Sequence, residues 1–135
     1  MGYWGVAYSE VVVTHAVGPG PLALHYQTSF LPDATYQENE IARIYEDSNR
    51  ISTYLGDWHT HPKGSSFLSR RDKRTLKRIA VHSEARCQIP LMAVLGGGED
   101  DWFMRFWKYQ PQSRPKELFS IKVESLLLKK YSHMR

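Results

Sequence analysis

The chain has 135 residues, of which 41% are hydrophobic and 24% are charged, and its formal net charge is +4. This length predicts one domain over residues 1–135, and the composition is typical of a soluble globular protein rather than a disordered one. No apolar run approaches the roughly 20 residues of a membrane helix, and no signal peptide is visible. The single cysteine, Cys87, cannot form an internal disulfide, so we expect a buried thiol in a reducing, cytoplasmic setting.

The first third of the sequence predicts a hairpin, a turn and a helix. Residues 3–8 and 10–17 are expected to pair as strands, because residues 11–14 are β-branched. The Gly-Pro-Gly-Pro turn at 18–21 ends the hairpin, and an apolar stripe at helical spacing begins after Asp33. His15 and His25 stand alone in this part of the chain, which is more typical of surface histidines than of metal ligands.

The middle of the sequence predicts a strand, a loop and a second helix. Residues 51–61 begin with an apolar run and are expected to form a buried strand, which Pro62 ends because proline has no N–H to donate to a sheet. The helix is expected at about 69–82, since Ser69 and Asp72 form a capping pair at its start.

The last part of the sequence predicts strands at 88–95, 102–109 and 118–128, a glycine-rich acidic turn at 96–101 and a basic tail at 129–135. The four tryptophans fall on expected strands, where packing in the core is the default. The expected elements along the chain are strand, strand, helix, strand, helix and then three strands. This order predicts an α/β fold in which helices pack on a mixed sheet.

Three candidate metal ligands are predicted to meet where the middle strand gives way to the helix. Side chains alternate along a strand, so His59 and His61 project from one face about 6.6 Å apart along the chain. The loop after Pro62 can bring the helix start back over that face and deliver Asp72. Two neutral imidazoles and one carboxylate are the ligand set of a catalytic zinc site with an open position for water. Zinc is therefore the expected cofactor, and manganese, iron and cobalt stay open as alternatives.

The chemistry of such a site is hydrolysis. Zinc lowers the pKa of its bound water towards about 7, and this water attacks a carbonyl that the metal polarises. Ser69 is expected beside the same opening, where its hydroxyl can cap the helix, hydrogen-bond a developing oxyanion, or do both. Asp57 shares the face of the histidines and is expected to support an imidazole from behind rather than to act as a base.

The pattern His-Thr-His-Pro, six residues, Ser, two residues, Asp at positions 59–72 resembles the signature of the JAMM or MPN+ metalloproteases. Residues 10–21, 30–33 and 90–98 also look like the prokaryotic JAB branch, so the similarity covers nearly the whole chain. Within this branch the sequence is most similar to isopeptidases associated with CD-NTase antiphage operons and other bacterial ubiquitin-like pathways.

The resemblance implies a fold and roles for individual residues. The fold would be a single-domain JAB/MPN-like (cytidine-deaminase-like) α/β fold with a curved mixed sheet and flanking helices. His59, His61 and Asp72 would hold zinc, and Ser69 would steady the tetrahedral intermediate. The family also carries an N-terminal helix and a general-base glutamate ahead of the first hairpin. The chain opens at Met1 within a stretch that resembles the one following this glutamate, so the N-terminal helix is expected to be missing here. The glutamate either lies upstream of Met1, if the start is misassigned or truncated, or is absent.

The favoured function is a zinc-dependent metallopeptidase, an isopeptidase that cleaves after the C-terminal glycine of a ubiquitin-like modifier or its conjugate. The alternative is a catalytically silent JAB domain that binds a modifier or partner, because a general base contributes about 10²–10⁴-fold and the glutamate is not in this chain. Glu10 is expected to be a solvated turn residue rather than a substitute for this general base.

The second helix carries a run of basic residues whose role stays open: Arg70, Arg71, Lys73, Arg74, Lys77 and Arg78. An ordinary helix surface, attraction of an acidic protein face and phosphate contacts with nucleic acid all fit this run. We expect a protein partner, a ubiquitin-like protein or its conjugate, rather than nucleic acid or a membrane. The identity of the modifier, the choice of peptide or isopeptide bond and the oligomeric state are not indicated.

Overall fold

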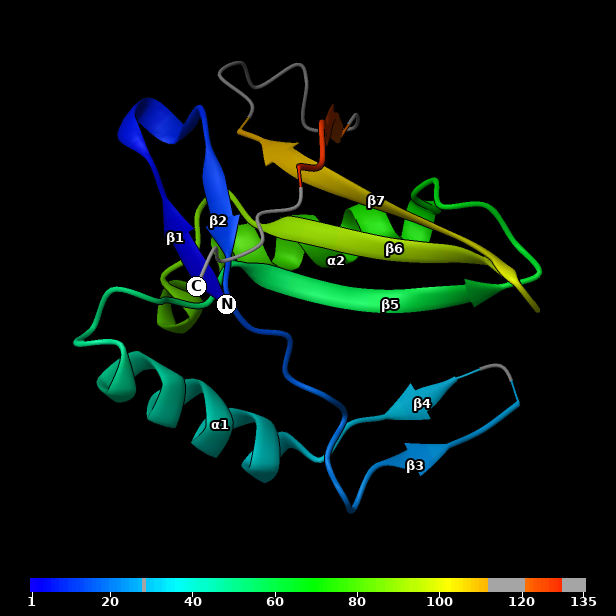
Figure 1. The fold of residues 1–135 in the computed structure, drawn as a ribbon, viewed down its shortest axis with the longest axis horizontal. Helices are drawn as coiled ribbons and strands as arrows, with labels where there is room; N and C mark the ends of the chain where they lie inside the picture. The colour runs from blue at the N-terminus through cyan, green and yellow to red at the C-terminus, as the bar shows by residue number, and fades with distance from the viewer. Residues whose placement is uncertain (28, 112–120, 130–135) are drawn as a thin grey trace, which may run out of the picture. The chain divides into compact units, whose positions relative to one another are not determined.

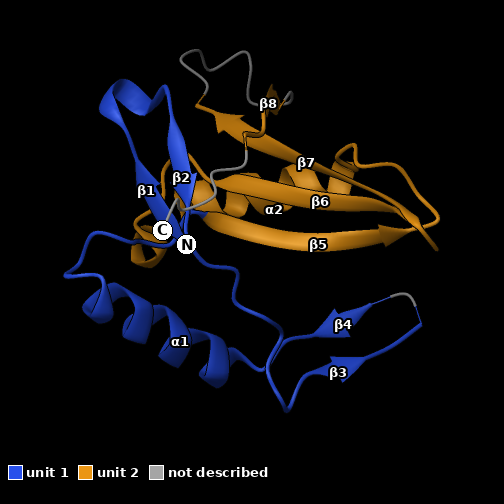
Figure 2. Cartoon of the chain, viewed as in Figure 1, with its two compact units in different colours: residues 1–55 blue, residues 56–135 orange. Residues whose placement is uncertain are grey.

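The computed structural model describes residues 1–27, 29–111 and 121–129. The chain divides into two compact units, Met1–Leu55 and Gly56–Arg135, which Figure 2 shows in blue and orange. The predicted single domain over residues 1–135 stays a prediction.

The first unit contains two small hairpins and one helix. Its elements are β1 (Gly2–Trp4), the 3-10 turn η1 (Val6–Tyr8), β2 (Val11–Val13), β3 (Leu24–His25), β4 (Phe30–Leu31) and α1 (Ala34–Asp47). β1 pairs antiparallel with β2, and β3 pairs antiparallel with β4. The predicted first hairpin is confirmed, although β2 is shorter than residues 10–17. The β3–β4 hairpin was not predicted, because two-residue strands are too short to show an alternating pattern.

The helix α1 is also confirmed, and its start follows from local hydrogen bonding. The side chain of Asp33 accepts a hydrogen bond from the backbone N–H of Tyr36 at 3.1 Å, which satisfies one of the free donors of the first turn. Farther along, Arg43 forms ion pairs with Glu40 and Asp47 on the exposed side of the helix.

The prediction of a strand beginning at Ile51 was wrong. Residues 51–55 follow a turn in which Asn49 and Arg50 both have positive φ. Within this segment Thr53 makes an isolated bridge with Gly2, and Ile51 is 59% exposed. A turn directly before an apolar run prevented that run from pairing over its whole length.

The second unit is built on a four-stranded mixed sheet in the order β5–β6–β7–β8. The strands are β5 (Gly56–Pro62), β6 (Leu91–Gly98), β7 (Asp101–Gln110) and β8 (Lys122–Leu126). β5 and β6 are parallel, and the other neighbours are antiparallel. The expected α/β fold with a mixed sheet is therefore confirmed, and Pro62 ends β5 as predicted.

The parallel pair is connected through α2 (Arg70–Val81) and the short 3-10 helix η2 (Ser83–Ala85). In Figure 1, α2 lies across β6 on the far side of the sheet. Leu76 is fully buried there and forms a core with Met92, Val94 and Tyr109. Burial of a leucine side chain contributes about 1.5–3 kcal/mol, so this contact holds α2 against the sheet.

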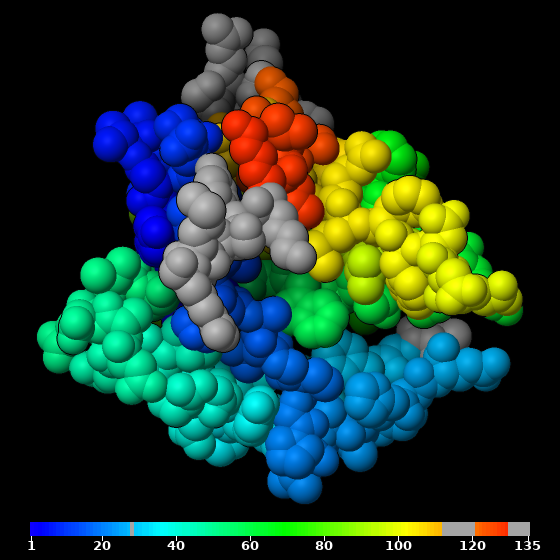
Figure 3. All heavy atoms as spheres, viewed as in Figure 1, coloured from blue at the N-terminus to red at the C-terminus, as the bar shows by residue number. Residues whose placement is uncertain are grey.

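Two details of the strands differ from the predictions. β6 continues through the glycines to Gly98, because Gly96–Gly98 pair with the start of β7 and only Glu99 and Asp100 form the turn. Trp58 and Trp102 are 44% and 43% exposed, so the expectation that they pack in the core was wrong. Atoms of β7, in yellow, are open to view on the face drawn in Figure 3.

The last predicted strand is confirmed only as β8, and residues 118–120 lie outside the described residues. Most of the predicted basic tail, residues 130–135, also lies outside them. Among the described residues, no helix has the length and apolar character needed to cross a membrane.

Candidate metal centre

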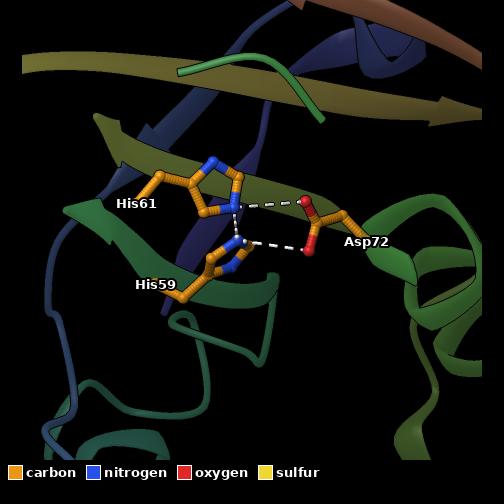
Figure 4. Close-up of side chains that lie close together, drawn as sticks. All are labelled: His59, His61 and Asp72. Carbon is orange, nitrogen blue, oxygen red and sulfur yellow. Dashed lines mark hydrogen bonds and ion pairs between the residues drawn. The ribbon is translucent and has the colours of Figure 1, made fainter. Parts of the chain in front are cut away.

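His59, His61 and Asp72 converge at the end of β5 and the start of α2, as Figure 4 shows. The Nε2 atoms of the two histidines are 2.9 Å apart. His59 Nε2 lies 3.2 Å from Asp72 Oδ1, and His61 Nε2 lies 3.4 Å from Asp72 Oδ2. The histidine side chains are 26% exposed and that of Asp72 is 13% exposed, so the group is largely shielded but still accessible to solvent.

The sequence dictates this convergence through alternation and capping. In the parallel pairing His59 stands opposite Val94 and His61 opposite Gly96, which puts both imidazoles on the face that α2 covers. Asp72 is the third residue of the helix. Its Oδ2 accepts from the backbone N–H of Ser69 at 2.8 Å, while its own N–H donates to Ser69 Oγ at 3.1 Å. This capping box aims the carboxylate toward the strand.

The ring of His61 is oriented from behind by a backbone carbonyl. Its Nδ1 lies 2.9 Å from the carbonyl oxygen of Ser65, which can only accept, so Nδ1 carries the proton. In the neutral ring the lone pair is then on Nε2, facing His59 and the carboxylate of Asp72. Two acceptor groups, His61 Nε2 and the carboxylate of Asp72, therefore face the space beside His59 Nε2, where a cation could be bound. This is the tautomer in which a histidine binds a metal.

The spacing of the three groups fits a small divalent cation. For Zn–N distances of about 2.0–2.1 Å, tetrahedral ligand atoms lie about 3.3 Å apart. The two N–O separations, 3.2 and 3.4 Å, are close to this value but run to different oxygens of Asp72, and the N–N separation of 2.9 Å is shorter. All three ligand atoms lie within 4.8 Å of one another. Two imidazoles and one carboxylate leave a fourth tetrahedral position for water or substrate.

The electrostatic surroundings favour a neutral His59. Burial is the largest effect and lowers the pKa of His59 below its ordinary value, and the neighbouring His61 lowers it further. The carboxylates of Asp72 and Asp57 act in the opposite direction. The net result favours the uncharged imidazole, which is the form that coordinates a metal. Asp57 is thus close enough to influence His59, while its predicted supporting role stays a prediction.

The loop between β5 and α2 is held against the sheet by several hydrogen bonds. Trp107 Nε1 donates to the carbonyl of Ser66 at 2.9 Å. The N–H of Lys63 donates to the carbonyl of Gly97 at 2.7 Å, and the N–H of Gly97 donates to Gly64 at 2.8 Å. These contacts fix the segment whose Ser65 carbonyl orients His61.

Gly96 is the residue of β6 on which this loop rests. A Cβ built at Gly96 would lie 2.5 Å from the carbonyl carbon of Ser65 and 2.6 Å from the nitrogen of Ser66. Both contacts are with backbone, so a larger residue would push the loop outward. Sequence patterns placed Gly96 in a turn, and only the pairing with His61 across the sheet reveals this role.

A Gly96→Ala substitution is therefore expected to weaken metal binding about 10–100-fold, because the loop shift withdraws the Ser65 carbonyl from His61. Crowding of this kind also lowers stability by about 1–3 kcal/mol. Zinc affinity by competition with a chromogenic chelator and unfolding in urea measure the two effects.

Gly98→Ala is the matched control, because a Cβ on Gly98 would meet only the nitrogen of Lys63, at 3.8 Å. An equal loss of zinc affinity in both variants would contradict the role assigned to Gly96.

The other candidate residues are not members of this group. His15 and His25 are exposed on the first unit, where His15 Nδ1 contacts Thr14 Oγ1 and His25 stacks on Phe30, and Glu10 is exposed as well. Cys87 is 7% exposed, as predicted for a buried thiol. Burial, with a smaller contribution from Asp57, raises the pKa of Cys87 to about 11, so this thiol is protonated at neutral pH and is a poor nucleophile.

Comparisons with known proteins are consistent with this geometry. Residues 5–110 match the family described as prokaryotic homologs of the JAB domain. A protein of Sinorhizobium fredii (strain NBRC 101917 / NGR234), named "Probable metalloprotease y4qB", is 41% identical over 108 residues. That match covers 79% of this chain, which spans 65% of the relative's length.

Two proteins named "CD-NTase/cGAS isopeptidase" are also similar. The one from Escherichia coli (strain TW11681) is 24% identical over 111 residues, or 82% of this chain and 68% of the relative. The one from Enterobacter hormaechei subsp. hoffmannii (strain UCI 50) is 46% identical over 44 residues, or 33% of this chain and 24% of the relative. The family match extends over more than half of the chain and includes the whole His-His-Asp group. The chain therefore belongs to the prokaryotic homologs of the JAB domain.

Proposed function

We propose that this chain is the catalytic domain of a zinc-dependent metallopeptidase, an isopeptidase that cleaves after the C-terminal glycine of a ubiquitin-like modifier or its conjugate. The convergence of His59, His61 and Asp72 carries the proposal. The names of the similar proteins support the reaction class, because they include a metalloprotease and two isopeptidases. An isopeptidase acts on a protein conjugate, which makes a protein the expected substrate.

The residues of this chain would divide the work between binding the metal and stabilising charge. A zinc ion, when bound, supplies a Lewis acid that activates water and polarises the scissile carbonyl. His59, His61 and Asp72 would hold it with one position open. The carbonyl of Ser65 keeps the proton of His61 on Nδ1, so that Nε2 is free for coordination.

Ser69 would stabilise the negative charge that develops on the substrate carbonyl oxygen. Its Oγ already accepts the N–H of Asp72, but the hydroxyl proton is a separate donor that this hydrogen bond does not use. A donor fixed at a helix N-cap is preorganised, which is the condition under which it lowers a barrier most effectively. Capping and catalysis by Ser69 are therefore compatible.

A catalytically silent JAB domain is the alternative, and one observation favours it. Among the described residues, the group of side chains whose ligand atoms lie within 4.8 Å of one another includes no glutamate that could serve as general base. Reading the DNA upstream of the Met1 codon in frame tests whether such a glutamate precedes this sequence. A silent domain would bind a modifier or a partner and show metal binding without turnover.

The proposed function predicts metal-dependent cleavage of a fusion in which a ubiquitin-like modifier is joined through its C-terminal glycine to a reporter. A chelator should abolish cleavage, and zinc should restore it. A His59→Ala protein should show no cleavage above background, because one of three ligands is lost. The experiment uses the chain together with any in-frame upstream extension. Equal rates for the wild-type and His59→Ala proteins would contradict a metallopeptidase, and zinc binding without cleavage would favour the silent domain.

A further inference from the structure

The outward side of α2 carries four arginines, which we call the arginine face: Arg70, Arg71, Arg74 and Arg78. All four are exposed, whereas Leu76 on the opposite side is fully buried against the sheet. At 3.6 residues per turn the four lie within an arc of about 100° and extend about 12 Å along the helix. Their charges therefore form one patch.

Nothing in the described residues neutralises the arginine face. Among the described residues, none of these four arginines takes part in an ion pair. Asp72 is the only acidic residue of the helix, and it points inward to the metal centre. The patch thus presents uncompensated positive charge to its surroundings.

This arrangement works against the stability of the helix. Like charges spaced three or four residues apart repel, as in the pairs Arg70–Arg74, Arg74–Arg78 and Arg71–Arg74. Arg70 and Arg71 also stand in the first turn, where the helix dipole disfavours cations. Natural proteins break such local rules mainly at functional sites, so the repulsion within the arginine face points to a binding surface.

The arginine face adjoins the metal centre through the chain itself. Arg70 and Arg71 directly precede Asp72, so the N-terminal end of this face lies within one helical turn of a candidate metal ligand. Val81, which is 71% exposed, follows on the same side of the helix and adds an apolar contact. Arginine side chains with an apolar neighbour suit a protein surface, where guanidinium groups pair with carboxylates in a bidentate geometry.

We propose that the arginine face binds an acidic surface of the protein substrate, with several Asp or Glu side chains spread over about 12 Å. The assignment of this partner as the substrate rests on the proposed function. The surface would raise the local concentration of acidic conjugates at the metal centre and would discriminate against basic ones.

The test compares wild-type protein with an Arg74→Glu/Arg78→Glu variant in binding a fluorescein-labelled glutamate-rich peptide, measured by fluorescence anisotropy. We expect the affinity for the peptide to fall as salt rises. At low salt, the affinity of the variant should be at least about tenfold lower than that of the wild type. Lys122→Glu/Lys129→Glu is the matched control, because it changes the net charge equally at exposed residues of β8 and beyond. The affinity of the control for the peptide should fall by less than about threefold.

A labelled DNA duplex and a single-stranded RNA serve as competing probes. Tighter binding of either nucleic acid than of the peptide, with loss in the Arg74→Glu/Arg78→Glu variant, would overturn the proposal in favour of phosphate recognition. Equal losses in the variant and the control, or no peptide binding at low salt, would also overturn it.

This assay needs no turnover, so its result is separate from that of the proposed function. Peptide binding through the arginine face in a protein that cleaves nothing would leave an acidic partner established and remove the isopeptidase. Cleavage of the modifier fusion, together with peptide binding that the Arg74→Glu/Arg78→Glu substitutions leave unchanged, would support the isopeptidase and remove the acidic partner of the arginine face.

Discussion

An Asp72→Asn protein is expected to bind zinc more than about 100-fold more weakly than the wild type and to lose cleavage activity. Replacing a residue that only supports a metal ligand already lowers metal affinity about 10–100-fold, and Asp72 is itself a proposed ligand. The amide keeps an oxygen that can accept from the N–H of Ser69, so the cap at the start of α2 survives. Zinc affinity by chelator competition and thermal unfolding of the zinc-free proteins measure the two roles separately.

The matched control is Asp33→Asn, which makes the same chemical change at the N-cap of α1, where the carboxylate accepts from Tyr36. We expect it to leave zinc affinity unchanged. If Asp72→Asn unfolded at a much lower temperature but kept its zinc affinity, Asp72 would be a capping residue alone and the metal centre would lose its third ligand.

A Ser69→Gly protein is expected to cleave with kcat reduced about 10²–10³-fold, the usual effect of removing one donor to a developing oxyanion. Glycine replaces serine at an N-cap for only a few tenths of a kcal/mol, so stability should change little. The backbone N–H of residue 69 still donates to Asp72, and zinc affinity should therefore be retained. Steady-state kinetics on the modifier fusion, with unfolding and zinc titration alongside, measure these quantities.

Ser69→Thr provides the rescue, because threonine retains a hydroxyl and caps helices almost as well. Recovery of most of kcat in this variant would tie the effect to the hydroxyl group. An unchanged kcat in Ser69→Gly would mean that Ser69 acts in capping and not in catalysis.

Local rules predicted the second helix and the ligands of the candidate centre. Ser69 and Asp72 begin the helix because their capping box is a contact between residues three apart. His59 and His61 share a face because alternation along a strand needs no tertiary partner.

The errors arose where pairing partners are distant in sequence. Residues 51–55 were predicted as a strand because the segment begins with Ile51 and ends with Leu55. The turn at Asn49 and Arg50 instead leaves only an isolated bridge to Gly2. Gly96–Gly98 read as a turn because glycine is common in turns, yet they pair with residues of β7. An exposed Trp58 could not be distinguished from a buried one, since aromatic residues favour strands on either face.

The sequence by itself determined the candidate ligands, the capping of the helix that carries Asp72, and the resemblance to the JAB family, because each depends on residue type at short spacing. Only the tertiary structure decided how those ligands are held. The Ser65 carbonyl behind His61, the hydrogen bond from Trp107 to Ser66 and the support from Gly96 all join the loop to side chains or strands. Trp107 is 41 residues from Ser66, and Gly96 rests under the loop because β6 pairs beside β5. Contacts of such separation leave no local pattern, because they exist only once the sheet has formed.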